Sequence, residues 1–271
     1  MTEPLNTPLY DSKIRRVIDL DDIYDCNDWL RRNKDKLITV DVETTGLSRD
    51  DELTSIQFGN KREAWVLDPH HRSTELIERL LLHDYLLAHN APFDAYHLAK
   101  FSGTTPGFPT MSQQDVLAKM QDTQIFSKLV DPRNKGQGGV GHSLKDLAAY
   151  YIGKEAKEAQ EQLQAGGKKW NEMSIFDDDF VRYGGMDVIL TARLFQTLEF
   201  RVKELGVDHL VEFDRQVQQI VTGMSERGMR VDPIYAEDLY AELGREEDGY
   251  RGMANALGVT NVNSTKEVAA A

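Results

Sequence analysis

The alternation of apolar and polar positions predicts strands and helices in turn over the first half of the chain. The apolar run Leu37–Val40 is typical of a buried strand, and two further strand-like stretches follow at 53–58 and 64–67. Because the turn residues Gly59-Asn60-Lys61 separate these two stretches, we expect a three-stranded antiparallel meander. The other elements predicted here are a short edge strand at 16–20, helices at 21–32 and 73–82, a strand at 85–89, and a helix that Pro92 opens.

Helical spacing of apolar residues dominates the second half. The predicted helices are 123–129, 144–151, 177–200 and two stretches within 207–253 that Gly228–Pro233 separates. The remaining expectations are a strand or short helix near 116–120 and loops at 103–110 and 134–141. Together these elements predict an α/β domain over residues 1–205. A helical segment over 206–271 follows, and it is too short to bury much core alone.

The charged, glutamine-rich segment 153–172 is predicted to lie outside the core. Within it, Lys168, Lys169 and Trp170 could contact a single nucleic-acid strand by charge and stacking. A solvated surface loop explains the same residues at least as well, so both interpretations stay open.

The overall charge limits the kinds of ligand that the chain can bind. Its 271 residues carry a net charge of −13, which argues against a high-affinity nucleic-acid binder because phosphate binding usually shows as a basic patch. The charge is compatible with an enzyme that binds a polyanion through metal ions held by its own carboxylates. For such an enzyme, we expect another domain or a partner to supply further affinity.

The single cysteine and the lack of long apolar runs favour a cytoplasmic protein with no membrane partner. Cys26 has no second cysteine for an internal disulfide, and we expect a small, partly buried side chain rather than a nucleophile. No apolar run approaches the length of a membrane span, and the start Met1-Thr2-Glu3-Pro4 lacks the pattern of a signal peptide.

Two carboxylates, Asp41 and Glu43, lie at the end of the strand that Leu37–Val40 begins. Residues two apart on a strand point to the same face, so these side chains should project side by side. Like charges held this close raise each other's pKa unless a cation lies between them, and paired oxygen ligands suit Mg²⁺ or Mn²⁺. An Asp-x-Glu sequence also occurs by chance on solvated strands, so a metal site needs support from the rest of the chain.

Four further features bear on a metal site. Asp94 and Asn90 lie where a buried strand meets its following helix, and helix capping alone would explain them. Asp187 lies among apolar residues of the long helix, and a buried carboxylate is costly unless it is paired or coordinated. Tyr183 should lie on the same helix face as Asp187, where a core aromatic is the simpler interpretation. The intervening Gly184-Gly185 indicates close packing or a helix that opens easily.

In chain order, these residues resemble the three motifs of the DEDD 3′→5′ exonucleases. The matching stretches are Asp41-Val42-Glu43-Thr44-Thr45-Gly46-Leu47, His89-Asn90-Ala91-Pro92-Phe93-Asp94 and Tyr183-Gly184-Gly185-Met186-Asp187. A tyrosine four residues before the last aspartate resembles the tyrosine branch, since the histidine branch would need His where Arg182 stands. The spacing and the connecting segments 122–129 and 143–147 resemble the proofreading domain of family A DNA polymerases. This resemblance implies a ribonuclease-H-like mixed sheet flanked by helices, with a short helical segment after it.

The resemblance also implies hydrolysis of a phosphodiester bond with two Mg²⁺ or Mn²⁺ ions. Asp41 would bridge both ions. Glu43 and Asp187 would complete the site of the attacking water, and Asp94 would hold the second ion. Tyr183 would orient the water, because its ordinary pKa of about 10 makes it a poor general base.

The substrate implied by the resemblance is the 3′ end of a single-stranded or frayed DNA, with a nucleoside 5′-monophosphate as product. Leu47 would contact the terminal base, and Asn90 would support the substrate or the turn before Asp94. Thr44 would be a further substrate contact. Unpaired ends are cheaper to unstack, which favours the removal of mismatches.

The resemblance continues beyond the exonuclease motifs. Residues 224–232 and 261–268 resemble the opening of a polymerase domain, where the thumb begins. Nothing in the sequence resembles the palm or the fingers. We therefore expect a fragment or split-gene product, of phage origin, that acts with a polymerase domain in cis or in trans.

Three other interpretations stay open. The first is an RNA-processing exonuclease of the same fold, which would not explain the thumb-like segment 224–268. A non-catalytic domain that binds DNA ends or braces a polymerase would have less need for Asp41, Glu43, Asp94 and Asp187. The chain could also be the front end of a full polymerase, in which case it should not extend a primer by itself.

Overall fold

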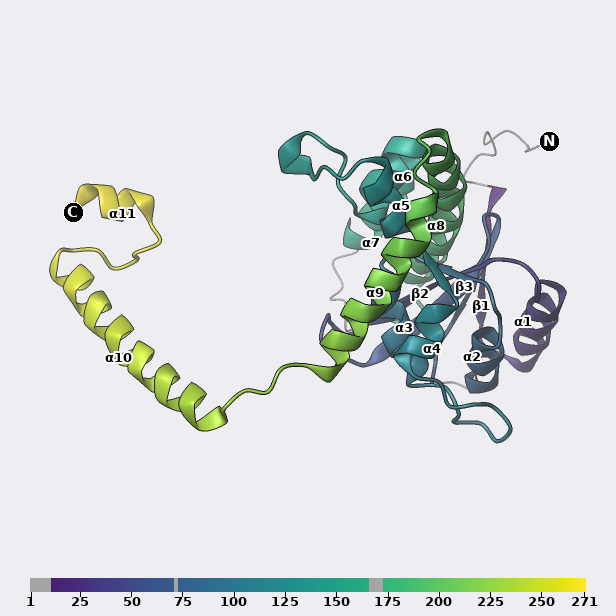
Figure 1. Cartoon of the computed structure of the whole chain (residues 1–271), viewed down its shortest axis with the longest axis horizontal. Helices are drawn as coiled ribbons and strands as arrows, with labels where there is room; N and C mark the ends of the chain where they lie inside the picture. Colours follow the sequence, from purple (N-terminus) through teal and green to yellow (C-terminus); the bar gives the residue numbers. More distant parts are fainter. Residues whose placement is uncertain (1–10, 71–72, 166–172) are drawn as a thin grey trace. The chain divides into compact units, whose positions relative to one another are not determined.

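The computed structural model describes residues 11–70, 73–165 and 173–271 (Figure 1). The chain divides into two compact units, Met1–Met224 and Ser225–Ala271. Lys168, Lys169 and Trp170 lie outside the described residues. Among the described residues, no helix is long and apolar enough to cross a membrane.

The first unit contains a six-stranded mixed sheet in the order β1-β4-β3-β2-β5-β6. The strands are β1 (Lys13–Val17), β2 (Ile38–Thr44), β3 (Leu53–Gly59), β4 (Glu63–Leu67), β5 (Leu86–Ala88) and β6 (Met120–Asp122). β2, β3 and β4 form the predicted antiparallel meander. β1, β5 and β6 each pair in parallel. The edge strand begins before the predicted 16–20, because Lys13–Val17 pairs with the whole of β4.

Helices surround this sheet (Figure 1). They are α1 (Leu20–Arg32), α2 (Thr74–Leu81), α3 (Ala91–Ala99), α4 (Gln113–Ala118), α5 (Thr123–Val130), α6 (Leu144–Tyr151), α7 (Glu158–Ala165), α8 (Asp178–Glu204) and α9 (His209–Arg227), with 3₁₀ turns η2 (Lys135–Gln137) and η3 (Lys154–Lys157). The helix predicted at 21–32 forms because Asp19 caps it in a capping box with Asp22 and basic residues end it.

Alternation along β2 assigns its side chains to two faces of the sheet. Ile38, Val40 and Val42 are buried in the main hydrophobic core together with residues of α1, α2 and α3. Asp41 and Glu43 point to the opposite face, which α8 covers. The period of two along β2 therefore places both carboxylates between the sheet and the long helix.

The glycine pair in α8 allows the helix to lie close against the sheet. A Cβ on Gly184 would come within 2.8 Å of Gln57 Nε2, and a Cβ on Gly185 would come within 2.5 Å of Ile14 Cγ2. No real side chain tolerates such distances without displacement of its neighbours. Close packing is therefore the reason for glycine at both positions.

Some segments differ from the predicted pattern. The region near 116–120 forms both a helix and a strand, because Ser112 caps α4 and β6 then pairs with β5. The predicted loop at 134–141 contains η2, which Asn134 caps. Cys26 is fully rather than partly buried, and burial raises the pKa of its thiol well above the usual range. An inert thiol fits this environment.

The second unit contains the end of α9, α10 (Pro233–Ala256) and α11 (Thr265–Ala270), the last of which the sequence pattern did not predict. No residue of α10 is buried in this fully described segment. The unit begins after Met224 rather than at 206, since the first part of α9 packs on the sheet unit. There Arg215 donates hydrogen bonds to the carbonyls of Ala118 and Met120, at 3.0 and 3.2 Å. The assignment of residues 206–271 to a polymerase thumb stays a prediction.

Candidate active site

Three carboxylates meet in the space between β2 and α8. β2 carries Asp41 and Glu43, and α8 carries Asp187. One carboxylate oxygen from each residue lies within 4.8 Å of those from the other two. Ligand sets made only of oxygen atoms suit hard divalent cations such as Mg²⁺ and Mn²⁺. The chemistry of this carboxylate cluster therefore fits a metal site.

Asp94 lies beside the carboxylate cluster, in the first turn of α3. The residue is only 2% exposed, and its Oδ1 accepts a hydrogen bond of 3.1 Å from the backbone N–H of Val42. This bond ties α3 to β2 at the residue between Asp41 and Glu43. The structure thus brings all four predicted carboxylates to one place, although Asp94 is not among the three whose oxygens lie within 4.8 Å of one another.

Burial changes the protonation of these carboxyl groups. It raises the pKa of Asp41 to about 7, against the opposing effects of Lys145 and of a hydrogen bond from Gln57. Burial and the charge of Asp41 raise the pKa of Glu43 and of Asp94 well above the usual range. Ionising all these groups at once is unfavourable without added positive charge. A bound cation would favour the ionised forms.

Lys145, on α6, is a buried cation of this site that the sequence interpretation missed. Its ammonium contacts Asp187 Oδ1 and lies 4.4 Å from the centre of the Tyr183 ring. Burial lowers the pKa of Lys145 to about 8, although Asp41 and Glu43 act in the opposite direction. The sequence held a signal, because Lys145 stands three residues before the buried Ala148 on the same helix face.

Tyr183 lies on α8, where its partly buried ring contacts Lys145 and packs against the small apolar cluster of Met173 and Phe180. Burial and the charges of Glu43 and Asp41 raise the pKa of its hydroxyl well above the usual value. The hydroxyl therefore stays protonated at neutral pH. It can donate a hydrogen bond but cannot act as an effective base.

Gln57, on β3, is a second missed residue. It is fully buried, and its Nε2 donates to Asp41 Oδ2 at 3.2 Å while its Oε1 accepts from Ser55 Oγ at 3.2 Å. Its side chain fills the space that Gly184 leaves free. The side-chain amide of Gln57 thus fits against Gly184 and at the same time orients Asp41.

Asp122, at the end of β6, holds the segment that leads to Asp94. It accepts hydrogen bonds from the backbone N–H groups of Asn90 and Ala91, at 2.9 and 3.0 Å. Gln218 of α9 donates a further bond to it at 2.6 Å. Sequence reasoning placed Asp122 in a connecting segment and gave it no role in the site.

The three predicted substrate contacts differ in accessibility. Leu47 is 91% exposed just after β2, so its side chain is accessible to a ligand. Asn90 is exposed in a left-handed conformation with φ of 72° at the start of α3. Thr44 is buried, and its hydroxyl donates to the carbonyl of Gly46. Thr44 therefore shapes the turn that presents Leu47.

The sheet order and the acidic site define a ribonuclease-H-like nuclease fold, which solved structures share. Brucella melitensis NrnC with bound Mg²⁺ is 21% identical with a TM-score of 0.53, over 80% of this chain and 94% of that one. RNase D of Escherichia coli is 13% identical with a TM-score of 0.56, over 78% of this chain and 51% of that one. Both identities are low, so these likenesses concern the fold.

Residues 19–203 match the model of a 3′–5′ exonuclease family, the type associated with family A DNA polymerases, and the chain belongs to this family. The DNA polymerase of Mycobacterium phage D29 is 32% identical over 270 residues, which cover 93% of this chain and 43% of that protein. The DNA polymerase of Mycobacterium phage L5 is 30% identical over 249 residues, or 86% of this chain and 40% of that protein. The chain thus spans less than half the length of these relatives.

Proposed function

We propose that this chain is a two-metal 3′–5′ exodeoxyribonuclease that removes nucleotides from single-stranded or frayed DNA during proofreading. The observation that carries the proposal is the meeting of Asp41, Glu43 and Asp187 within 4.8 Å in a chain of the 3′–5′ exonuclease family. The similarity to phage DNA polymerases supports DNA as the substrate. It also supports a polymerase domain, in cis or in trans, as the partner.

The carboxylates have distinct proposed roles. Asp41, Glu43 and Asp187 would hold one divalent cation, and Asp94 together with Asp41 would hold the second. Such ions supply an activated water at neutral pH and neutralise charge on the leaving 3′ oxygen. Gln57 keeps Asp41 oriented through its 3.2 Å hydrogen bond, and Val42 does the same for Asp94.

Tyr183 and Lys145 would act on the reacting groups without serving as bases. The protonated Tyr183 hydroxyl would orient the attacking water by a hydrogen bond, because its raised pKa keeps the proton in place. Lys145 fixes Asp187 by direct contact. Four carboxylates balance two divalent cations, so the ammonium of Lys145 would supply one further positive charge, which favours the binding of an anionic phosphodiester.

Substrate binding would use the exposed residues around the carboxylate cluster. Leu47 would pack against the terminal base, Asn90 would contact the strand, and Thr44 would hold the turn that carries Leu47. The product would be a nucleoside 5′-monophosphate. Frayed ends would react faster than paired ends because an unpaired base costs less to unstack.

The test is degradation of 5′-labelled strands by the full chain with Mg²⁺, with Mn²⁺ and with EDTA. Single-stranded DNA should shorten one nucleotide at a time from its 3′ end with either metal and stay intact in EDTA, and matched duplex DNA should react more slowly. A parallel RNA of the same sequence separates this proposal from RNA processing. Preferred cleavage of RNA, or metal binding without any cleavage, would contradict the proposal.

A further inference from the structure

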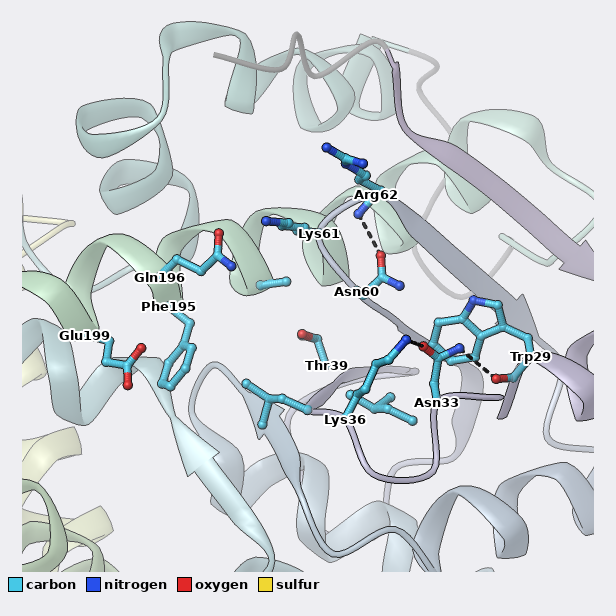
Figure 2. A pocket seen from close by; sticks show the side chains of 13 residues that line it. Trp29, Asn33, Lys36, Thr39, Asn60, Lys61, Arg62, Phe195, Gln196 and Glu199 are labelled. Carbon is cyan, nitrogen blue, oxygen red and sulfur yellow. Dashed lines mark hydrogen bonds between the residues drawn. The ribbon is translucent and has the colours of Figure 1, made fainter. Parts of the chain in front are cut away.

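A concave region lies at the opposite end of the sheet from the carboxylates (Figure 2). It encloses about 410 Å³ between the start of β2, the hairpin that joins β3 to β4, and the second half of α8. Thr39 pairs with Gly59 at this end, whereas Glu43 pairs with Ser55 at the other. Along α8, Gln196 lies nine positions after Asp187, which corresponds to an axial rise of about 13 Å.

This basic pocket carries positive charge in a chain that is acidic overall. Its charged lining residues are Lys36, Lys61, Arg62 and Glu199. Glu199 Oε1 accepts a hydrogen bond of 2.9 Å from Lys203, which offsets the single carboxylate. The pocket is therefore a region of positive electrostatic potential on a molecule of net charge −13.

Hydrogen bonds hold the segments that present these cations. Arg193, buried beneath the hairpin, donates to the carbonyl of Lys61 at 2.9 Å. Asn60 Oδ1 accepts from the backbone N–H groups of Arg62 and Glu63, at 2.8 and 3.1 Å, which fixes the turn. Lys36 Nζ donates to Asn33 Oδ1 at 3.1 Å. The hairpin that carries Lys61 and Arg62 is thus held by α8 and by its own turn, and Lys36 is held within the turn that follows α1.

Apolar and aromatic side chains accompany the cations. Leu37, Ile38 and Phe195 also line the basic pocket, and Figure 2 shows Lys61 extending towards the part of α8 that carries Phe195 and Gln196. Phe195 keeps a fixed orientation through an edge-on contact with Phe126, with ring centroids 5.1 Å apart. Cations beside an aromatic surface suit a ligand in which phosphates alternate with flat bases. An acidic peptide would interact with the cations and would have no flat base to stack on the aromatic surface.

We propose that the basic pocket binds the phosphodiester backbone of a single DNA strand whose 3′ end lies at the carboxylate cluster. The inference rests on the proposed function. The rise of about 13 Å along α8 corresponds to at most roughly four nucleotides, because a single strand is at least as extended as one strand of a duplex, which rises about 3.4 Å per nucleotide. The pocket supplies affinity that the carboxylates cannot, because without divalent cations they repel phosphate.

The test compares two double variants of the full chain with the same change in net charge. Lys36→Glu with Lys61→Glu reverses two positive charges of the basic pocket. Lys128→Glu with Lys154→Glu reverses the charges of two exposed lysines elsewhere. Fluorescence anisotropy measures binding of a labelled ten-nucleotide dT strand in EDTA, so that the strand stays intact. The pocket variant should bind at least about tenfold more weakly. Its plot of log K against log salt should be less steep by about 1.4, since each lost single-strand phosphate contact removes about 0.7.

Several outcomes decide the proposal. Equal weakening by both double variants, or an unchanged salt slope, would overturn it. So would displacement of the strand by poly-glutamate as efficiently as by unlabelled dT, which would indicate an acidic protein partner. Lys36→Gln with Lys61→Gln should weaken binding in the same direction with an unchanged melting temperature, which separates charge loss from misfolding.

A separate assay distinguishes this inference from the proposed function. The one phosphodiester of a dinucleotide is the bond that is cleaved at the carboxylate cluster, so no second linkage is left for the basic pocket, and Mg²⁺-dependent hydrolysis of a dinucleotide by the unaltered chain reports on the carboxylates alone. Hydrolysis together with pocket-independent strand binding would overturn only the inference. Pocket-dependent strand binding without hydrolysis would overturn only the function.

Discussion

β2 joins two ends of the sheet that differ in charge and in burial. At one end Asp41 and Glu43 lie beneath α8, where burial raises the pKa of both. At the other end Lys36 and Arg62 are exposed to solvent around the basic pocket. Buried charge is costly and is therefore kept where chemistry requires it, whereas exposed charge is inexpensive and attracts ligands over longer distances.

The comparison also shows why net charge is a coarse guide. A value of −13 suggests a surface that repels DNA. The structure separates the charge by location, with carboxylates in an enclosed cluster that fits cations and with lysines in an open pocket.

The largest effect should come from Asp41→Ala at the acidic end. We expect loss of all Mg²⁺-dependent nucleotide release, because the proposed site loses the carboxylate shared by both cations. A 5′-labelled single strand followed over time provides the measurement, and the Lys128→Glu and Lys154→Glu variant serves as the control. Full activity in Asp41→Ala would show that the chemistry occurs elsewhere.

Lys145→Met should produce the next largest loss. We expect hydrolysis to slow by roughly 10- to 100-fold, the range found when a group that orients a metal ligand is removed. Lys157→Met is a matched control, because Lys157 pairs with Asp146 on the adjacent surface instead of with Asp187. Single-turnover rates measure both variants. Similar rates in the two variants would show that Lys145 has no role in hydrolysis.

Gly184→Ala should destabilise the fold and disturb Asp41 together. The added Cβ would press on Gln57, and overpacking of this kind typically costs about 1–3 kcal/mol. Gly244→Ala on α10 meets no atom within 4 Å, so it should leave stability unchanged or raise it by up to about 1 kcal/mol. Urea denaturation compares the two. A stable, fully active Gly184→Ala variant would show that the close approach of α8 does not matter.

Tyr183→Phe should have a smaller effect on hydrolysis than Asp187→Ala. The phenylalanine keeps the ring beneath Lys145 and removes only the hydroxyl that orients water. Asp187→Ala removes a cation ligand and also leaves Lys145 without its contact. Rates at saturating Mg²⁺ give the comparison, and equal losses would assign Tyr183 a larger chemical role.

The smallest effect should be a pH dependence of stability without metal. The unfolded chain loses the Asp41 proton near its ordinary pKa of 3.8, and the folded chain loses it near 7. Rising pH between these values therefore favours the unfolded state. Melting temperatures in EDTA should fall as pH rises through this window, and Mg²⁺ should reduce the fall. A melting temperature in EDTA that rises from pH 5 to 7 would contradict this sign.

The sequence predicted those parts of the site that follow from local periodicity. Alternation along β2 placed Asp41 and Glu43 on one face, and the spacing of four residues placed Tyr183 and Asp187 on one side of α8. The turn at Gly59-Asn60-Lys61 predicted the meander. These features depend on neighbours within a few residues, which a single sequence displays directly.

Contacts between distant segments were not predictable in the same way. Lys145 meets Asp187 only because α6 packs on α8. Lysine is rarely buried, so the residue type alone suggested an exposed side chain. The basic pocket forms because Lys36 lies beside the hairpin of Lys61 across the paired strands. The end of the first unit at Met224 depends on how α9 packs, which periodicity does not encode.

A calorimetric titration of Mn²⁺ into the unaltered chain and into Asp41→Ala shows whether the carboxylate cluster holds the metal ions. We expect saturable binding to the unaltered chain, with two ions bound when a single strand with a non-hydrolysable 3′-terminal linkage is present, and loss of that binding in Asp41→Ala. Unchanged Mn²⁺ binding by Asp41→Ala would contradict the claim that the carboxylate cluster beneath α8 is the metal site.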